Sequence, residues 1–250
     1  MTVLSHARIL LPAAVLVTAL PAAAQSQSPP RVEISANVGA QTPVSTFTES
    51  GTFPSNGGEM STVTVDHSMK TGLGFNVGGA VRVIRKLWVG AQYAAANMSP
   101  SASLEAAIPH PILFNAPRSV GGSVNDVTRT ERRVHVDLIY ALPIRAMEVR
   151  VLAGPTLFSL KQDSVSGVTI NETYPFDTAT FASATRKQLS DTATGFNAGI
   201  DVSRALTSHV AVGGIIRYSR ATVKFDDSEV GKHTIKTGGV ETLAGVRFRF

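Results

Sequence analysis

The 250-residue chain contains no cysteine, which excludes a disulfide framework and a lipid-modified N-terminal cysteine. Charged residues are scarce, at 16% of the chain, and the basic ones are scattered instead of clustered with aromatics. Because a nucleic-acid-binding face needs such clusters, we expect no nucleic-acid partner. After the N-terminus, no apolar run reaches the roughly 18 residues that a transmembrane helix requires.

Enzyme and metal-site motifs are missing as well. The chain has no H-E-x-x-H, no G-x-S-x-G, no phosphate-binding loop and no cysteine pair for zinc. His135 and Asp137 do lie two apart on one strand face, as an acid/base pair or a two-ligand metal corner requires. Such a pair needs a third member, and Arg133 on the same face is a charge partner. We therefore predict a polar network there, with no catalytic residue, no metal site and no cofactor.

The start of the chain has the features of a secretory signal. Arg8 supplies a positive charge, residues 9–20 form an apolar segment, and Ala22-Ala23-Ala24 matches a small-residue cleavage site. The apolar segment is too short to span the roughly 30 Å of a bilayer core. We predict a cleaved signal peptide over residues 1–24, followed by a short polar leader over residues 25–30.

From Arg31 onward, apolar and polar residues alternate in long segments, which is the period of a β-strand. In the first segment, Val32 and Ile34 fall on one face and Glu33 on the other. Segments of about ten residues are long for a soluble sandwich, in which five or six are usual. The eight predicted strands are residues 31–40, 70–84, 87–97, 128–142, 147–161, 192–204, 209–225 and 239–250.

Long polar connections alternate with short turns between these strands. Residues 41–69, 98–127 and 162–191 are predicted to be long loops, because Ser, Thr, Gly and Pro are frequent there. The prolines of the second connection would also obstruct a central strand. A shorter loop is predicted around residues 226–233. Short turns are predicted at residues 85–86, 143–146 and 205–208.

The last predicted strand places Ala244, Val246, Phe248 and Phe250 on one face. This pattern resembles the final strand of bacterial outer-membrane β-barrels, which typically carry a C-terminal Phe with apolar residues at alternating positions before it. In that family the barrel-assembly machinery reads this strand. The resemblance therefore implies that machinery as a partner, with Val246, Phe248 and Phe250 as the assembly signal.

The alternation of long connections and short turns is also similar to that of outer-membrane barrels. The predicted fold is all-β, an eight-stranded antiparallel up-and-down transmembrane β-barrel over residues 31–250. It is similar in plan to OmpA-, OmpX- and OmpW-like barrels, and we expect no appended periplasmic domain. Because lipid offers no hydrogen-bond partner, the sheet must close on itself. Closure would place Glu33 near Arg247 and Arg249.

Apolar side chains are then expected to face lipid, and polar side chains to face the lumen. Charges inside a narrow barrel are costly unless they are paired, and those on the inward faces are mixed in sign. The sequence therefore predicts a filled, salt-bridged interior. The predicted interior polar network is Glu33, Arg82, Arg133, His135, Asp137, Glu148, Arg150, Asp201, Arg217, Glu241, Arg247 and Arg249.

These features predict an integral outer-membrane protein of a Gram-negative-type bacterium. The leading functional prediction is a non-enzymatic envelope scaffold whose surface loops serve interaction or adhesion. One alternative is a narrow channel or carrier for small solutes, although an eight-stranded lumen is just wide enough for side chains to fill. Another is a lipid A-modifying or other envelope enzyme. The expected partners are outer-membrane lipid and an extracellular ligand at the loops.

Overall fold

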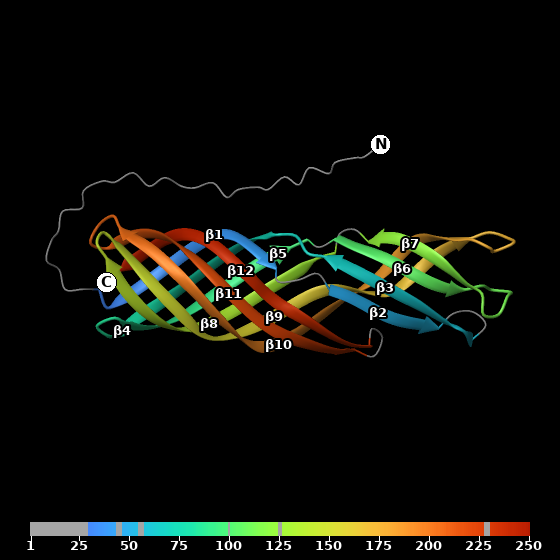
Figure 1. Cartoon of the computed structure of the whole chain (residues 1–250), viewed down its shortest axis with the longest axis horizontal. Helices are drawn as coiled ribbons and strands as arrows, with labels where there is room; N and C mark the ends of the chain where they lie inside the picture. Colours follow the sequence, from blue (N-terminus) through green and yellow to red (C-terminus); the bar gives the residue numbers. More distant parts are fainter. Residues whose placement is uncertain (1–29, 44–46, 55–57, 100, 125–126, 228–230) are drawn as a thin grey trace, which may run out of the picture.

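The computed structural model describes residues 30–43, 47–54, 58–99, 101–124, 127–227 and 231–250. Most of these residues lie in β-strands, and the strands form a closed barrel with a four-stranded sheet beyond one end (Figure 1). Among the described residues, no helix is long and apolar enough to cross a membrane. The predicted signal peptide, and the predicted leader up to residue 29, lie outside the described residues.

Eight antiparallel strands close the barrel, and the first strand pairs with both the last strand and β4. At the seam, the Phe250 N–H donates to the Val32 carbonyl at 2.9 Å, and the Arg31 N–H donates to the Phe250 carbonyl at 2.7 Å. The predicted fold class is therefore confirmed. In order around the barrel, the strands are β1 Val32–Pro43, β12 Gly231–Arg249, β11 Val210–Asp227, β10 Ala179–Ala205, β9 Met147–Glu172, β8 Arg129–Ile144, β5 Leu87–Met98 and β4 Gly72–Ile84.

Strand ends at one end of the barrel agree closely with the predicted turns. Residues 85–86, 145–146 and 206–209 connect neighbouring strands there, and the C-terminus lies at the same end (Figure 1). We call it the short-turn end. At the opposite end, β9 and β10 continue well past the predicted residues 147–161 and 192–204. These two strands connect the barrel to the outlying sheet.

The barrel wall is apolar outside and polar inside, the reverse of a water-soluble protein. On the outside, Val136 is 46% exposed and Phe248 is 44% exposed. The adjacent side chains Asp137 and Arg247 are 1% and 0% exposed, because they point into the lumen. Each strand places successive side chains on opposite faces, so this distribution follows from the period-two pattern.

Aromatic side chains lie at both margins of the apolar wall, as in the girdles of transmembrane barrels. Away from the short-turn end, Phe75 contacts Tyr93 with ring centroids 6.3 Å apart, and Phe196 contacts Tyr218 at 6.1 Å. Both phenylalanines belong to a repeated Gly-Phe-Asn sequence, in which the Phe faces outward and the Asn is buried. The repeat thus supplies one girdle ring and one lumen amide per copy. Tyr140, Phe248 and Phe250 are the exposed aromatics toward the short-turn end.

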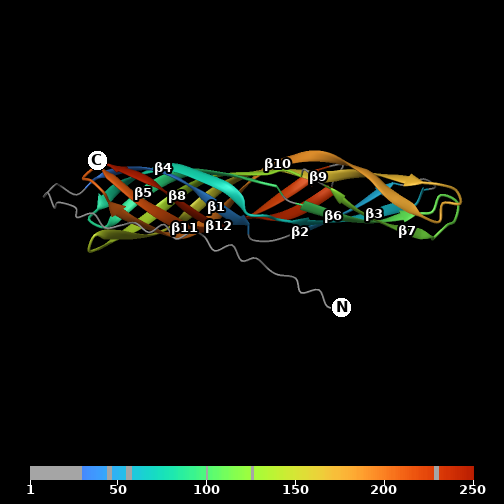
Figure 2. The same ribbon diagram turned by 90° about the horizontal axis from the view of Figure 1, so that it is seen from above.

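The prediction of long polar loops was wrong, because residues 41–69 and 98–127 contain strands. These form a four-stranded sheet in the order β2-β3-β6-β7, seen beyond the barrel in Figure 2. Pro109 and Pro117 do not obstruct it, because they face each other at the ends of two neighbouring strands. The bounds are β2 Phe47–Pro54, β3 Met60–Ser68, β6 Ser101–Pro109 and β7 Pro117–Val124.

One face of this sheet packs against the outer part of the β9–β10 hairpin, where residues 162–191 were also predicted to be a loop. The β9–β10 ladder shifts register there, since Thr185 pairs with Gly167 and Arg186 with Val165. Such a bulge re-aims side chains along a strand. The packed layer has its own apolar core of Val63, Val65, Ala102, Leu104, Ala106, Ile108, Val120, Val124, Val127 and Val165.

Candidate functional site

The barrel lumen holds most of the predicted site residues. Ten of the twelve predicted network residues are buried there, while Arg82 and Glu148 are partly exposed toward the short-turn end. The ion pairs among lumen side chains join six arginines to six carboxylates. These are Arg129, Arg133, Arg150, Arg217, Arg247 and Arg249, with Glu33, Glu131, Asp137, Glu148, Asp201 and Glu241.

In the part of the polar network nearest the short-turn end, Glu33 accepts hydrogen bonds from two arginines. Arg150 donates to both of its carboxylate oxygens, at 2.5 and 2.7 Å, and Arg249 donates at 2.8 Å. Arg150 also contacts Glu148, and its guanidinium lies 4.9 Å from the centroid of the Trp88 ring. The predicted pair of Glu33 with Arg249 is thus present, whereas Arg247 has a different partner. These contacts tie β1, β9 and β12 together across the lumen.

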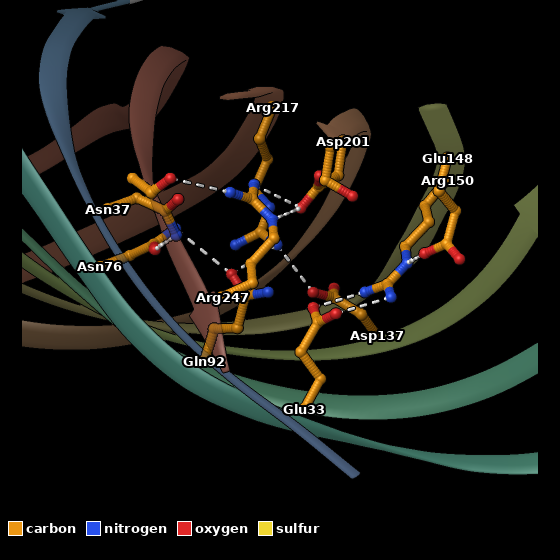
Figure 3. A network of polar contacts seen from close by, with 12 residues as sticks. Glu33, Asn37, Asn76, Gln92, Asp137, Glu148, Arg150, Asp201, Arg217 and Arg247 are labelled. Atoms are coloured by element: carbon orange, nitrogen blue, oxygen red, sulfur yellow. Dashed lines mark hydrogen bonds and ion pairs between the residues drawn. The ribbon is translucent and has the colours of Figure 1, made fainter. Parts of the chain in front are cut away.

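A chain of hydrogen bonds crosses the middle of the barrel (Figure 3). Asn37 donates to Asn76 at 2.7 Å, and Asn76 donates to Gln92 at 3.2 Å. Arg217 donates to Gln92 at 2.9 Å and to Asp137 at 2.8 Å. The five side chains come from β1, β4, β5, β8 and β11, so the chain braces much of the barrel wall. Beside it, Arg247 donates to Asp201 at 2.8 and 3.2 Å.

A third group of polar contacts lies toward the outlying sheet. Arg133 donates to Glu241 at 2.8 Å and also to Gln41. Gln41 in turn donates to Glu131 at 3.2 Å, and Arg129 donates to the same carboxylate at 2.5 and 3.0 Å. Three of these residues were not predicted from the sequence. Gln41 had been placed in a loop, while Arg129 and Glu131 share the inward face of Arg133 and could have been found by the same alternation.

Apolar side chains fill the lumen beside and beyond these polar groups. One cluster includes Trp88, Leu152 and Ile215, and another, at the far end, is formed by Leu160, Leu189, Val223, Phe225 and Ile235. A cavity in the lumen bounded by Glu33, Gln92 and Asp201 has a volume of about 10 Å³. That volume holds roughly one water molecule. The part of the lumen around this cavity is therefore packed rather than open.

His135 and Asp137 are both in the lumen but do not bond to each other. The His135 Nδ1 atom lies 2.8 Å from the Thr156 hydroxyl, whereas Asp137 pairs with Arg217. Glu241 is the carboxylate nearest the imidazole, at 3.9 Å from Nε2. Within the described residues, no group of three His, Cys, Asp or Glu side chains has metal-binding geometry.

The far end of the outlying sheet is a second candidate site. Arg118, which is buried, donates to the Pro109 carbonyl at 3.0 Å and to the Phe176 carbonyl at 2.8 Å. It also pairs with Glu172 at 2.8 Å. The β6–β7 turn is thereby fixed beside the β9–β10 turn. The large hydrophobic residues that these turns expose, Ile112, Leu113, Phe114 and Tyr174, are 55–79% exposed, and we call them the distal tip.

A closed β-barrel with an apolar exterior, aromatic margins and a paired polar interior defines a transmembrane barrel. The chain matches the family described as "Outer membrane protein beta-barrel domain" over residues 11–248, and it belongs to that family. In such barrels the short turns face the periplasm and the longer connections face outward. The outlying sheet and its distal tip are therefore on the extracellular side.

Solved structures with a similar chain path include Neisserial surface protein A, with 14% identity and a TM-score of 0.44. The alignment covers 88% of this chain and 97% of that one. For OprG from Pseudomonas aeruginosa, the identity is 12%, the TM-score 0.48, and the coverage 89% and 96%. For Ail of Yersinia pestis, the identity is 11% and the TM-score 0.39, and the alignment covers 89% of this chain and 100% of that one. No curated protein matches the chain.

Proposed function

We propose that the protein is a non-enzymatic envelope scaffold, whose filled barrel anchors an extracellular β-structure that makes contacts at the cell surface. The observation that carries this proposal is the distal tip. Phe114 is 75% exposed and Tyr174 is 79% exposed, beyond the barrel and therefore in water. Large apolar side chains gathered in water commonly mark an interaction site.

The distal tip is held in place by the structure beneath it, which favours a role in binding a partner. Arg118 links both turns by hydrogen bonds, and the sheet beneath them has an apolar core. A preorganised tip loses little conformational freedom when it binds. Asp177 lies in the β9–β10 turn with its side chain 73% exposed, so a suitable partner has an apolar pocket with a basic group at its rim.

The packed lumen argues against the channel and enzyme alternatives. The cavity beside Glu33, Gln92 and Asp201, at about 10 Å³, is too small for a solute, and His135 and Asp137 are 0% and 1% exposed. Export through a cleaved signal peptide, and assembly directed by Phe250 and its neighbours, belong to the same proposal. Steady openings of the purified protein in a planar bilayer at neutral pH would contradict the sealed lumen.

Surface binding can be tested by expressing the protein on a non-adherent bacterium and measuring attachment to immobilised epithelial cells. We expect Phe114→Ser to reduce attachment several-fold. Leu206→Ser is a matched control, because it removes an exposed apolar side chain at the short-turn end. If both variants attached as well as the parent protein, the proposed role of the tip would be wrong.

A further inference from the structure

A hollow at the short-turn end of the barrel is lined mostly by cations. It lies around the β4–β5 turn and has a volume of about 650 Å³. Its lining contains no acidic residue. Val83 and Ile84, which are 59% and 63% exposed, form an apolar side of the hollow. The complete lining is Arg31, Arg82, Val83, Ile84, Arg85, Lys86 and Pro143.

The backbone holds these cations close together. The Arg82 N–H donates to the Arg31 carbonyl at 2.8 Å, and the Ala141 N–H donates to the Lys86 carbonyl at 2.8 Å. Arg85 and Lys86 are the two residues of the tight turn. Because the barrel ladder fixes the backbone at these positions, the cationic side chains all extend from one small region of the barrel. An anion bound among them would remove their mutual repulsion.

Three of the cations are available for such an anion. In the described part of the chain, no carboxylate forms an ion pair with Arg31, Arg85 or Lys86. The planar fork of an arginine side chain matches the geometry of a phosphate group, while lysine adds a compact point charge. A phosphate group therefore fits the charged part of the hollow.

The surroundings of the hollow indicate an amphiphilic ligand. Tyr140, Phe248 and Phe250 are exposed on the outer wall toward the same end, where a girdle marks the boundary between lipid and water. An acyl chain leaving the hollow would run along the apolar wall that begins at Val83 and Ile84. We propose that the hollow binds the phosphate headgroup of an anionic phospholipid in the periplasmic leaflet of the outer membrane.

Binding is tested with the whole folded protein in zwitterionic detergent, titrated with short-chain phosphatidylglycerol and followed by native mass spectrometry. We expect tighter binding than for phosphatidylcholine with the same acyl chains. One cation near a membrane surface changes the affinity for anionic lipid by roughly five-fold. The double variant R85Q/K86Q should therefore bind phosphatidylglycerol about 25-fold more weakly.

The matched control is K224Q/K236Q, which removes two exposed lysines at the opposite end of the barrel. It should retain affinity within about two-fold, because neither lysine lines the hollow. Each variant is first shown to keep the gel shift on boiling that marks a closed barrel. An equal loss in both double variants, or none in R85Q/K86Q, overturns the proposal. Displacement of the lipid by an equal concentration of inorganic phosphate would reveal a simple anion site and overturn it as well.

Discussion

Apolar and polar residues alternate along the strands of both the barrel and the extracellular sheet. The apolar face points outward in the barrel and inward in the sheet. In the barrel, Val136 faces outward and Asp137 inward, whereas in β3 of the sheet Val65 is buried and Asp66 is exposed. The difference reflects what surrounds each part, lipid in one case and water in the other. A period-two pattern thus identifies a strand but does not say which face is the interior.

Strands β9 and β10 pass through both environments as continuous elements. Within the barrel, β9 places Arg150 inside and Val151 outside, and beyond it Val165 joins the core of the extracellular sheet. The register shift beside Val165 coincides with this change of interior. Local bulges therefore allow one strand to serve two cores.

The largest effect expected from this comparison follows removal of a lumen charge. Glu33→Ala leaves Arg150 and Arg249 buried with fewer partners, which should cost about 3–5 kcal/mol of unfolding free energy. Urea unfolding in micelles measures this loss. Glu105→Ala, on the exposed face of β6, should change the unfolding free energy by less than about 0.5 kcal/mol. Equal effects would mean that the lumen pairs do not stabilise the barrel.

A charge added to the outer face should distinguish lipid from water. Val136→Arg places a cation on the lipid-facing wall between the two aromatic margins, with an expected cost of about 2–4 kcal/mol. Thr62→Arg, on the exposed face of β3, should be nearly neutral, within about 0.5 kcal/mol. Unfolding in lipid vesicles measures both. If Thr62→Arg were the more costly variant, the comparison would be reversed.

A cavity in the extracellular core should loosen the sheet without opening the barrel. Leu104 is 1% exposed, and Leu104→Ala should destabilise the sheet by about 2 kcal/mol, because the sheet and hairpin can partly close over the gap. Limited proteolysis should then cut residues 44–124 faster, while the gel shift on boiling is retained. Ala107→Ser, on the exposed face of the same strand, is the control. Loss of the gel shift in Leu104→Ala would show that the two parts unfold together.

A change at the C-terminus is expected to have little effect on stability and a larger effect on assembly. Phe250 is 64% exposed, so Phe250→Ser should change the unfolding free energy by only about 0.5 kcal/mol. If the terminal ring is an assembly signal, however, the fraction of boiling-sensitive protein in the outer membrane should fall. Phe114→Ser makes the same replacement at the distal tip and should assemble normally. Equal assembly of both variants would contradict the assigned signal.

The barrel strands were predictable because outward residues such as Val134, Val136 and Leu138 are uniformly apolar over a long segment. The pair of Glu33 with Arg249 was predictable too, since closure brings the first and last strands together. The bond from Arg133 to Gln41 could not be predicted, because it depends on the register between strands that are far apart in the sequence. The position of a residue along its own strand does not specify its neighbour across a lumen.

The extracellular sheet escaped prediction for a different reason. Its strands are short and rich in small residues, so the alternation around Val63 and Val65 is weak beside the surrounding Thr and Ser. Prolines at 109 and 117 also argued against a strand, although they only end two of them. Short strands of this kind can be predicted only when the segment that they pack against is known. Here that segment is the β9–β10 hairpin, which is distant in the sequence.

The contact between Glu33 and Arg249 has a consequence for how the protein is made. These residues are separated by 216 positions, nearly the whole length of the chain. Until the last strand arrives, Glu33 lacks one of its two arginines, and a partial cylinder exposes unpaired backbone along its open side. Insertion into the membrane should therefore begin only when the polypeptide is complete, and the barrel should then close in one concerted step. A chain truncated shortly before its C-terminus should fail to insert and be degraded by periplasmic proteases.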